Sequence, residues 1–128
     1  MTSARLRHLW IAAIVVLVAA IVAGSLLPVP DVPAALGSDK YRHYFAYLLL
    51  ALFGSGIVTP DRLWRVMIRC FLLGLALELA QAVLTDTRLA EWTDLLANAA
   101  GVVTAWIVAA GGGAGWAYRV AARHLELR

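Results

Sequence analysis

Four long apolar stretches, separated by short polar segments, dominate the chain. They cover about residues 9–27, 41–58, 66–84 and 94–110. A helix needs roughly 20 predominantly apolar residues to cross a bilayer. Pro28 and Pro30 end the first stretch and Pro60 follows the second, because proline cannot continue a helix but suits its first turn. The pattern predicts an all-α integral membrane protein built as a four-helix bundle.

The composition supports a membrane location. Of the 128 residues, 62% are apolar and 15% are charged. A soluble domain is nearer half apolar and a quarter charged, and one of this size has too little interior to bury so many apolar side chains. The length predicts a single domain over residues 1–128. The one cysteine, Cys70, excludes an internal disulfide.

The distribution of basic residues predicts the orientation of the helices. Eight of the 11 basic residues fall on one side of the predicted spans: Arg5, Arg7, Arg62, Arg65, Arg69, Arg119, Arg123 and Arg128. Lys40, Arg42 and Arg88 fall on the other side. Because basic residues are in excess in cytoplasmic loops, both termini are expected inside the cell. The net charge of +3 reflects these loops, and no basic stripe predicts nucleic-acid binding.

The tail, about residues 114–128, has two interpretations. It carries Trp116, Val120 and Leu127 among arginines. This pattern suits a short amphipathic helix lying along the inner leaflet. It also suits an ordinary solvated terminus.

Polar side chains recur at helical spacing toward one end of three spans. The sets are Asp39, His43 and Tyr47; Glu78 and Gln81; and Asp94 and Asn98. Residues three or four apart share one face of a helix, so each set forms a stripe. All lie in the outer part of the membrane, with Glu78 roughly 9 Å below the outer end of its span. We therefore expect one shared pocket that opens to the extracytoplasmic side.

Each polar residue also has a structural explanation. Asp39 and Asp94 stand where an aspartate caps a helix, although Ser38 and Thr93 would serve equally well. The amides and the tyrosine would hold helices together through hydrogen bonds. A carboxylate as deep as Glu78 must be protonated or paired. Its candidate partners are the basic residues on the same side: Lys40, Arg42, His43 and Arg88.

The order of these motifs resembles the VanZ-like family of small membrane proteins. The matching residues are Asp39-Lys40-Tyr41-Arg42-His43 with Ala46-Tyr47, Glu78-Leu79-Ala80-Gln81, Arg88, and Asp94-Leu95-Leu96-Ala97-Asn98 with Gly101. They cover roughly residues 20 to 110. The chain departs from the family pattern at Ala90-Glu91, where small or hydroxyl residues are usual. The resemblance implies a place in the bacterial cytoplasmic membrane. The founding member is linked to resistance to the glycopeptide teicoplanin, but the resemblance implies no defined reaction.

Binding is the first of three functional hypotheses. A lipid-linked headgroup or a glycopeptide would be recognised at the outer leaflet. Lys40, Arg42 and Arg88 would contact its phosphate or carboxylate. The neighbouring polar side chains would orient the headgroup: Tyr47, Gln81, Asp94 and Asn98.

The second hypothesis is a membrane enzyme acting on such a headgroup. His43 would be a general base oriented by Asp39 or Glu78. Alternatively, these three residues and Asp94 would hold a divalent metal that activates water. Their spacing matches no strong metal motif, so no metal or cofactor is predicted. The third hypothesis is an accessory membrane subunit, with membrane lipids and a second copy of the chain as its partners; no pair of broken helices indicates a transporter.

Overall fold

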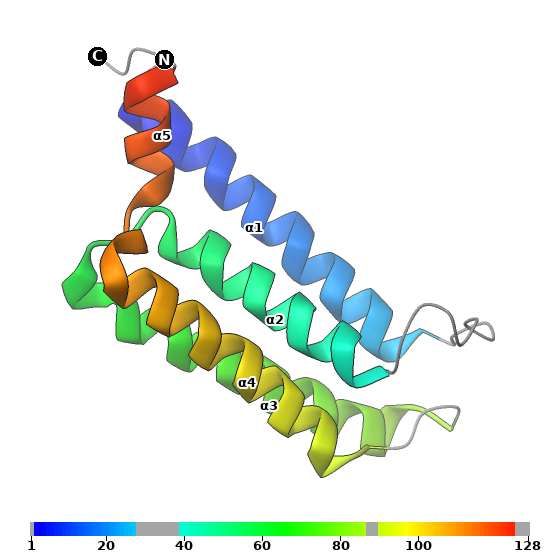
Figure 1. Cartoon of the computed structure of the whole chain (residues 1–128). Helices are drawn as coiled ribbons and strands as arrows, with labels where there is room; N and C mark the ends of the chain where they lie inside the picture. Colours follow the sequence, from blue (N-terminus) through cyan, green and yellow to red (C-terminus); the bar gives the residue numbers. More distant parts are fainter. Residues whose placement is uncertain (1, 28–38, 87–89, 125–128) are drawn as a thin grey trace.

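The computed structural model describes residues 2–27, 39–86 and 90–124. Its elements in chain order are α1 (Ser3–Leu26), α2 (Asp39–Ser55), the 3₁₀ turn η2 (Pro60–Arg62), α3 (Leu63–Leu84), α4 (Trp92–Val108), the π-helical turn η3 (Ala109–Gly113) and α5 (Trp116–His124) (Figure 1). The all-α prediction is confirmed for this part of the chain.

Within the described residues, three helices are long and apolar enough to cross a membrane. They cover Ser3–Leu26, Pro60–Leu84 and Trp92–Gly113. The prediction of a membrane protein is therefore supported by the folded chain as well as by its composition. The second predicted span, 41–58, corresponds to α2, whose 17 residues extend about 25 Å at 1.5 Å per residue. Helix α4 also has 17 residues but continues directly into η3, whereas α2 ends at Ser55.

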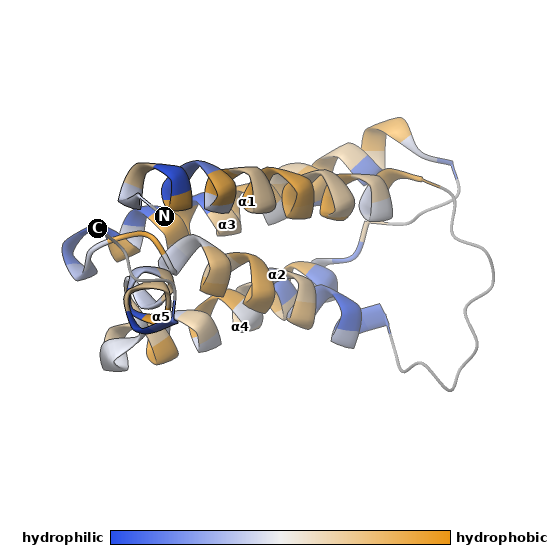
Figure 2. Ribbon diagram, turned by 90° about the horizontal axis from the view of Figure 1, so that it is seen from above, coloured by the Kyte–Doolittle hydropathy of each residue, from blue (hydrophilic) through white to orange (hydrophobic). Residues whose placement is uncertain are grey.

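The long helices lie side by side, and α2 packs most closely against α4 (Figure 1). Gly101 of α4 permits this contact, because a side chain there would meet the backbone of Tyr44 and Leu48. The core between these helices and α3 includes Leu50 and Met67. Figure 2 shows apolar residues along the helices and hydrophilic residues at the start of α2.

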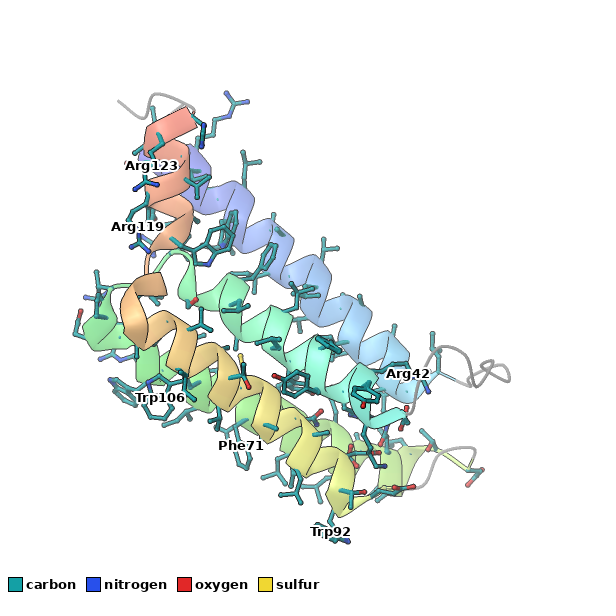
Figure 3. All side chains as sticks on the ribbon, in the orientation of Figure 1. Arg42, Phe71, Trp92, Trp106, Arg119 and Arg123 are labelled. Carbon is teal, nitrogen blue, oxygen red and sulfur yellow. The ribbon has the colours of Figure 1, made fainter. Side chains whose placement is uncertain are left out.

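The outward faces of the helices are apolar. Val16 on α1, Leu72 on α3 and Ile107 on α4 are all more than half exposed. Phe71 and Trp106 lie on the side of α3 and α4 that faces away from α1 and α2 in Figure 3. In water such surfaces would be costly, whereas lipid is an apolar solvent for them. The arrangement therefore has the outward apolar surface that a membrane protein needs.

Three aromatic rings join α1, α2 and α5 at one end of the molecule. Trp10 stacks on Phe53 and meets Trp116 edge-on, with ring centroids 5.0 Å apart in both pairs. The two indole N–H groups donate to carbonyls at the end of α2: Trp10 to Phe53 at 2.8 Å and Trp116 to Leu52 at 2.9 Å. Both carbonyls also accept a bond at the end of α2, Phe53 from the Gly56 N–H and Leu52 from the Ser55 hydroxyl, so the indoles add a second donor to each.

The predicted tail folds into α5 as far as His124. A turn leads into it, with Gly112 at φ +113° and Gly115 at φ +71°, a backbone region that glycine adopts readily. The Arg119 guanidinium donates to the carbonyls of Gly112 and Ala114 and closes this turn. α5 buries Ala117 on its inner face. Arg119 and Arg123 lie at this end of the molecule, whereas Arg42 and Trp92 lie at the other (Figure 3).

Candidate functional site

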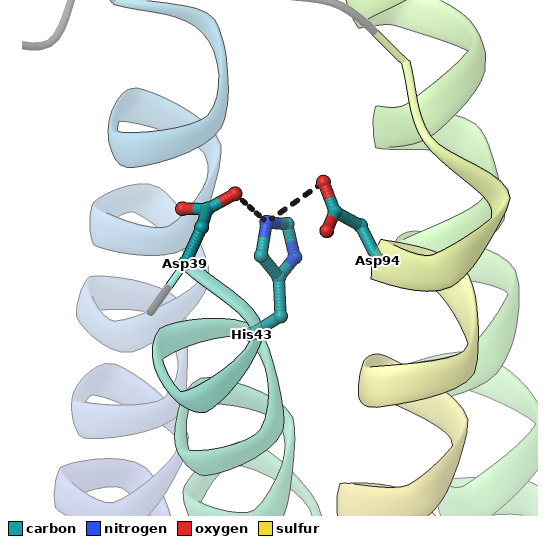
Figure 4. Close-up of side chains that lie close together, drawn as sticks. All are labelled: Asp39, His43 and Asp94. Atoms are coloured by element: carbon teal, nitrogen blue, oxygen red, sulfur yellow. Dashed lines mark ion pairs between the residues drawn. The ribbon is translucent and has the colours of Figure 1, made fainter. Parts of the chain in front are cut away.

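The predicted polar stripes meet where α2 and α4 begin and α3 ends. Asp39 and His43 come from the first two turns of α2, and Asp94 from the first turn of α4. One ligand atom from each of the three lies within 4.8 Å of the others. Figure 4 shows His43 between the two carboxylates. Residues more than 50 positions apart in sequence thus form one cluster.

His43 is held by hydrogen bonding at one ring nitrogen and faces carboxylates at the other. Its Nδ1 lies 3.0 Å from Oδ1 of Asn98, a residue only 1% exposed. An amide oxygen only accepts, so Nδ1 is the donor. Nε2 lies 3.4 Å from Oδ2 of Asp39 and 3.5 Å from Oδ2 of Asp94. Asn98, rather than Asp39 or Glu78, therefore holds Nδ1, and Nε2 faces both carboxylates.

Lys40 links the start of α2 to the start of α4. Its Nζ donates to Oδ1 of Asp94 and, at 2.6 Å, to Oε2 of Glu91. The side chain of Asp94 is 5% exposed, so Lys40 supplies the cation that a buried carboxylate requires. Lys40 lies just before the predicted span 41–58. Its hydrogen bond to Asp94, and to a smaller extent its bond to Glu91, raise the pKa of its ammonium group. The same contact lowers the pKa of Glu91.

The two aspartates bind side chains of other residues at the starts of α2 and α4. Asp39 accepts a hydrogen bond from Arg42 at 2.9 Å, and Asp94 accepts one from Lys40. Glu91 occupies the N-cap position of α4 and makes no side-chain capping bond there. Both carboxylates are therefore engaged with cations and His43, and both also lie in the first turn of a helix, where the helix dipole favours them.

The two predicted site residues of α3, Glu78 and Gln81, contact different parts of the molecule. Glu78 is buried and accepts a hydrogen bond from the backbone N–H of Glu91 at 3.3 Å. Within the described ranges no basic side chain forms an ion pair with Glu78. The Gln81 amide donates to the carbonyl of Ser25 at 2.8 Å and so joins α3 to α1. Gln81 thus holds two helices together through a hydrogen bond, as its structural explanation predicted.

Glu91 is the residue that sequence reasoning missed. It contacts Lys40, its N–H reaches Glu78, and its carboxylate accepts a hydrogen bond from Thr93 at 3.2 Å. The signal was present in the sequence, since Ala90-Glu91 is where the chain departs from the family pattern. Arg88, a predicted ligand contact, lies outside the described residues.

A cleft of about 280 Å³ opens between α1 and α2 beside His43. Asp39, Arg42 and His43 form its polar end, and Tyr47 lies deeper. The remaining lining residues are small or apolar, apart from one serine: Ala20, Ile21, Gly24, Ser25 and Ala46. The cleft thus joins charged groups at the helix ends to an apolar wall along the helices. Four of the predicted site residues share this cleft, whereas Asp94 and Asn98 contact His43 from α4.

The Asp39, His43 and Asp94 cluster has the donor atoms of a divalent-metal site. Imidazole nitrogen and carboxylate oxygen are common ligands of such ions. Both carboxylates, however, already face a permanent cation, Arg42 for Asp39 and Lys40 for Asp94. Glu78, the fourth ligand of the metal hypothesis, is not part of this group. A proton on His43 would satisfy the same carboxylates.

Comparison with known proteins found no match: no protein-family model, no curated protein and no solved structure resembles the chain significantly. The motif resemblance to the VanZ-like family therefore remains a prediction from the sequence.

Proposed function

We propose that this chain is a VanZ-like membrane protein that binds the polar headgroup of an amphipathic envelope ligand at its extracytoplasmic end. The observation that supports this most is the cleft between α1 and α2. It combines an arginine, an aspartate and a histidine with an apolar wall, the two surfaces that an amphiphile requires. A lipid-linked precursor or a glycopeptide with a lipid tail fits this chemistry.

In this proposal the helices α1 to α4 cross the bacterial cytoplasmic membrane four times, with both termini inside. The side-by-side packing of α1 to α4 supports four crossings (Figure 1). Arg119 and Arg123 lie at the end of the molecule opposite Arg42 (Figure 3), and the larger group of basic residues is expected inside. Trp10 and Trp116 lie near the inner end, where aromatic residues are enriched.

Labelling in intact cells tests this orientation. With the buried Cys70 replaced by alanine, Asp86→Cys should react with an impermeant thiol reagent before lysis. Asp61→Cys, in the loop at the opposite end, should react only after lysis. The reverse pattern would refute the orientation and would move the cleft to the cytoplasmic leaflet.

Arg42 is the group best placed to bind an anionic headgroup. Its side chain is 44% exposed and lines the cleft, while Asp39 holds one guanidinium nitrogen at 2.9 Å. A guanidinium has further N–H donors that can bind a phosphate or carboxylate in a fork. His43 and Tyr47 line the same cleft and would contact the rest of the headgroup.

Ligand-induced thermal stabilisation tests the binding proposal. Purified protein would be titrated with a polyprenyl phosphate, with teicoplanin, and with a neutral polyprenyl alcohol. Arg42→Gln and His43→Gln should weaken the response to the true ligand at least tenfold. Arg62→Gln, an exposed arginine at the other end, is the matched control and should leave it unchanged. A response that survives both cleft substitutions would refute binding there.

Catalysis is the second candidate function, and the geometry of His43 favours it. Nε2 faces the site while Asn98 holds Nδ1, the arrangement of an oriented general base or acid. A hydrolase or transferase acting on a lipid headgroup would lose its activity in His43→Gln. Release of phosphate or transfer of the headgroup from a polyprenyl phosphate, absent in that variant, would establish the enzyme. Binding without product from any such lipid, with or without divalent metal, would leave binding as the function.

A further inference from the structure

A second cleft, of about 600 Å³, lies at the opposite end of the molecule between α1 and α5. Its lining consists of Ser3, Ala4, Arg7, His8, Ile11 and Tyr118. Five of these come from the first turns of α1, and Tyr118 reaches the cleft from α5. It shares no lining residue with the cleft beside His43.

The chemistry of this second cleft is that of an anion site. Arg7 contributes a guanidinium, His8 an imidazole, and Ser3 and Tyr118 contribute hydroxyl donors. Neither α1 nor α5 contains a carboxylate within its described bounds, whereas the two helices carry four arginines: Arg5, Arg7, Arg119 and Arg123. No acidic neighbour on either helix therefore neutralises Arg7.

Helix α1 itself adds to this positive potential. The first turn of a helix has a partial positive charge that favours an acidic residue and disfavours a basic one. The first turn of α1 contains no acidic residue but includes Arg5, and Arg7 follows it. A bound anion would offset both the helix dipole and the repulsion between the arginines.

The cleft also has an apolar side that a simple ion does not need. Ile11, which is 40% exposed, lines its inner rim where the apolar run of α1 begins. Val120 of α5 is 48% exposed on the same short helix that carries Tyr118. Trp10, at the adjoining position of α1, belongs to the aromatic cluster with Trp116. The polar groups of the cleft are therefore placed for a lipid headgroup, and the apolar groups next to them for its acyl chains.

We propose that this cleft binds the phosphate headgroup of an anionic phospholipid, with Arg7 contacting the phosphate and Tyr118 donating to it. The acyl chains leave past Ile11 into the membrane. The lipid joins α1 to α5 and thereby secures the short helix against the long ones. This site depends on the membrane location of the chain and not on ligand binding at the His43 end, so each can fail without the other.

The test measures thermal stability of the detergent-solubilised protein during titration with short-chain lipids. Dioctanoyl phosphatidylglycerol should stabilise the protein at lower concentration than dioctanoyl phosphatidylcholine, which has no net charge. Arg7→Gln should raise the concentration needed about fivefold, the effect expected for one basic residue at a lipid surface. Tyr118→Phe should raise it about threefold through loss of one hydrogen bond.

Arg62→Gln is the matched control, because it removes one exposed arginine outside the cleft. Its response to phosphatidylglycerol should equal that of the unmodified protein. Equal losses in Arg7→Gln and Arg62→Gln would overturn the site and leave only a diffuse surface charge. Equal stabilisation by phosphatidylcholine, or by inorganic phosphate alone, would also overturn it. Repeating the phosphatidylglycerol titration in an Arg42→Gln background separates this site from the His43 cleft, because the fivefold effect of Arg7→Gln should persist there.

Discussion

Gly101 offers the sharpest test of how α2 and α4 assemble the site. A Cβ at this position would lie 2.9 Å from the Leu48 nitrogen and 3.2 Å from the Tyr44 carbonyl carbon, with the Tyr44 oxygen closer still. All three atoms belong to the backbone of α2, so no side-chain rotation can relieve the contact. Gly101→Ala must therefore push the two helices apart locally.

The magnitude follows from two opposing effects. Forcing extra methyl volume into a packed interface costs typically about 1–3 kcal/mol, and contacts with backbone belong at the upper end. Alanine recovers up to about 1 kcal/mol over glycine through its helix propensity. The net expected loss is about 2 kcal/mol, which lowers Tm by roughly 5–10 °C for a domain of this size. The hydrogen bonds His43–Asn98 and Tyr44–Thr104 cross the same interface and should lengthen.

Gly111→Ala is the matched control, since no atom lies within 4 Å of a Cβ built at Gly111. Thermal unfolding of both variants, purified in the same detergent, measures the difference. Gly111→Ala should match the unmodified protein or exceed it slightly, while Gly101→Ala should unfold several degrees lower. Equal midpoints for the two variants would show that α2 and α4 do not approach as closely as the structure places them.

Three further predictions concern the two ends of the molecule. Lys40→Met leaves the Asp94 carboxylate, 5% exposed, without its cation and should destabilise the protein by about 1–3 kcal/mol, measured by thermal unfolding; retained stability would show that Asp94 is neutral or otherwise paired. The bond with Lys40 lowers the pKa of Glu91 from its ordinary 4.5. The stabilisation that this bond gives the folded state is therefore complete above pH 4.5 and is lost as pH falls through the lower pKa of the folded protein. The Lys40→Met variant should lack the loss of stability on acidification that comes from the Lys40–Glu91 bond. Identical profiles of stability against pH for the variant and the unmodified protein would show that this bond does not stabilise the fold. Trp10→Phe removes one indole hydrogen bond to α2 and should cost about 0.5–1.5 kcal/mol, whereas Trp92→Phe, at 73% exposure, should cost less; equal losses would argue against the aromatic junction.

The apolar pattern along the sequence was enough to predict the helices and their approximate bounds. The third predicted span, 66–84, corresponds to α3 at Leu63–Leu84, and the fourth, 94–110, to α4 at Trp92–Val108. Helix formation depends on residues within a few turns, so local periodicity carries this information. The same periodicity placed Asp39 and His43 on one face of a helix before any neighbour was known.

Contacts between helices required the tertiary structure. Three residues give the clearest cases: Asn98 orients His43, Glu91 binds Lys40, and Ser25 accepts from Gln81. Each contact joins residues at least 50 positions apart in the chain, and spacing along one helix carries no information about which face of another it meets. The helix α1 contributes half of the cleft beside His43, although its sequence contains almost no polar residue to indicate that role.

The sequence alone therefore determined the helical class, the membrane location and the polar stripes, because these follow from local pattern and composition. Only the tertiary structure decided how the stripes meet. The close approach of α2 and α4 at Gly101 places Asp94 and Asn98 against His43. The packing of α5 against α1 through its small inner residues creates the second cleft at the opposite end. Both sites depend on how closely neighbouring helices can pack, a property of pairs of surfaces that no single stretch of sequence contains.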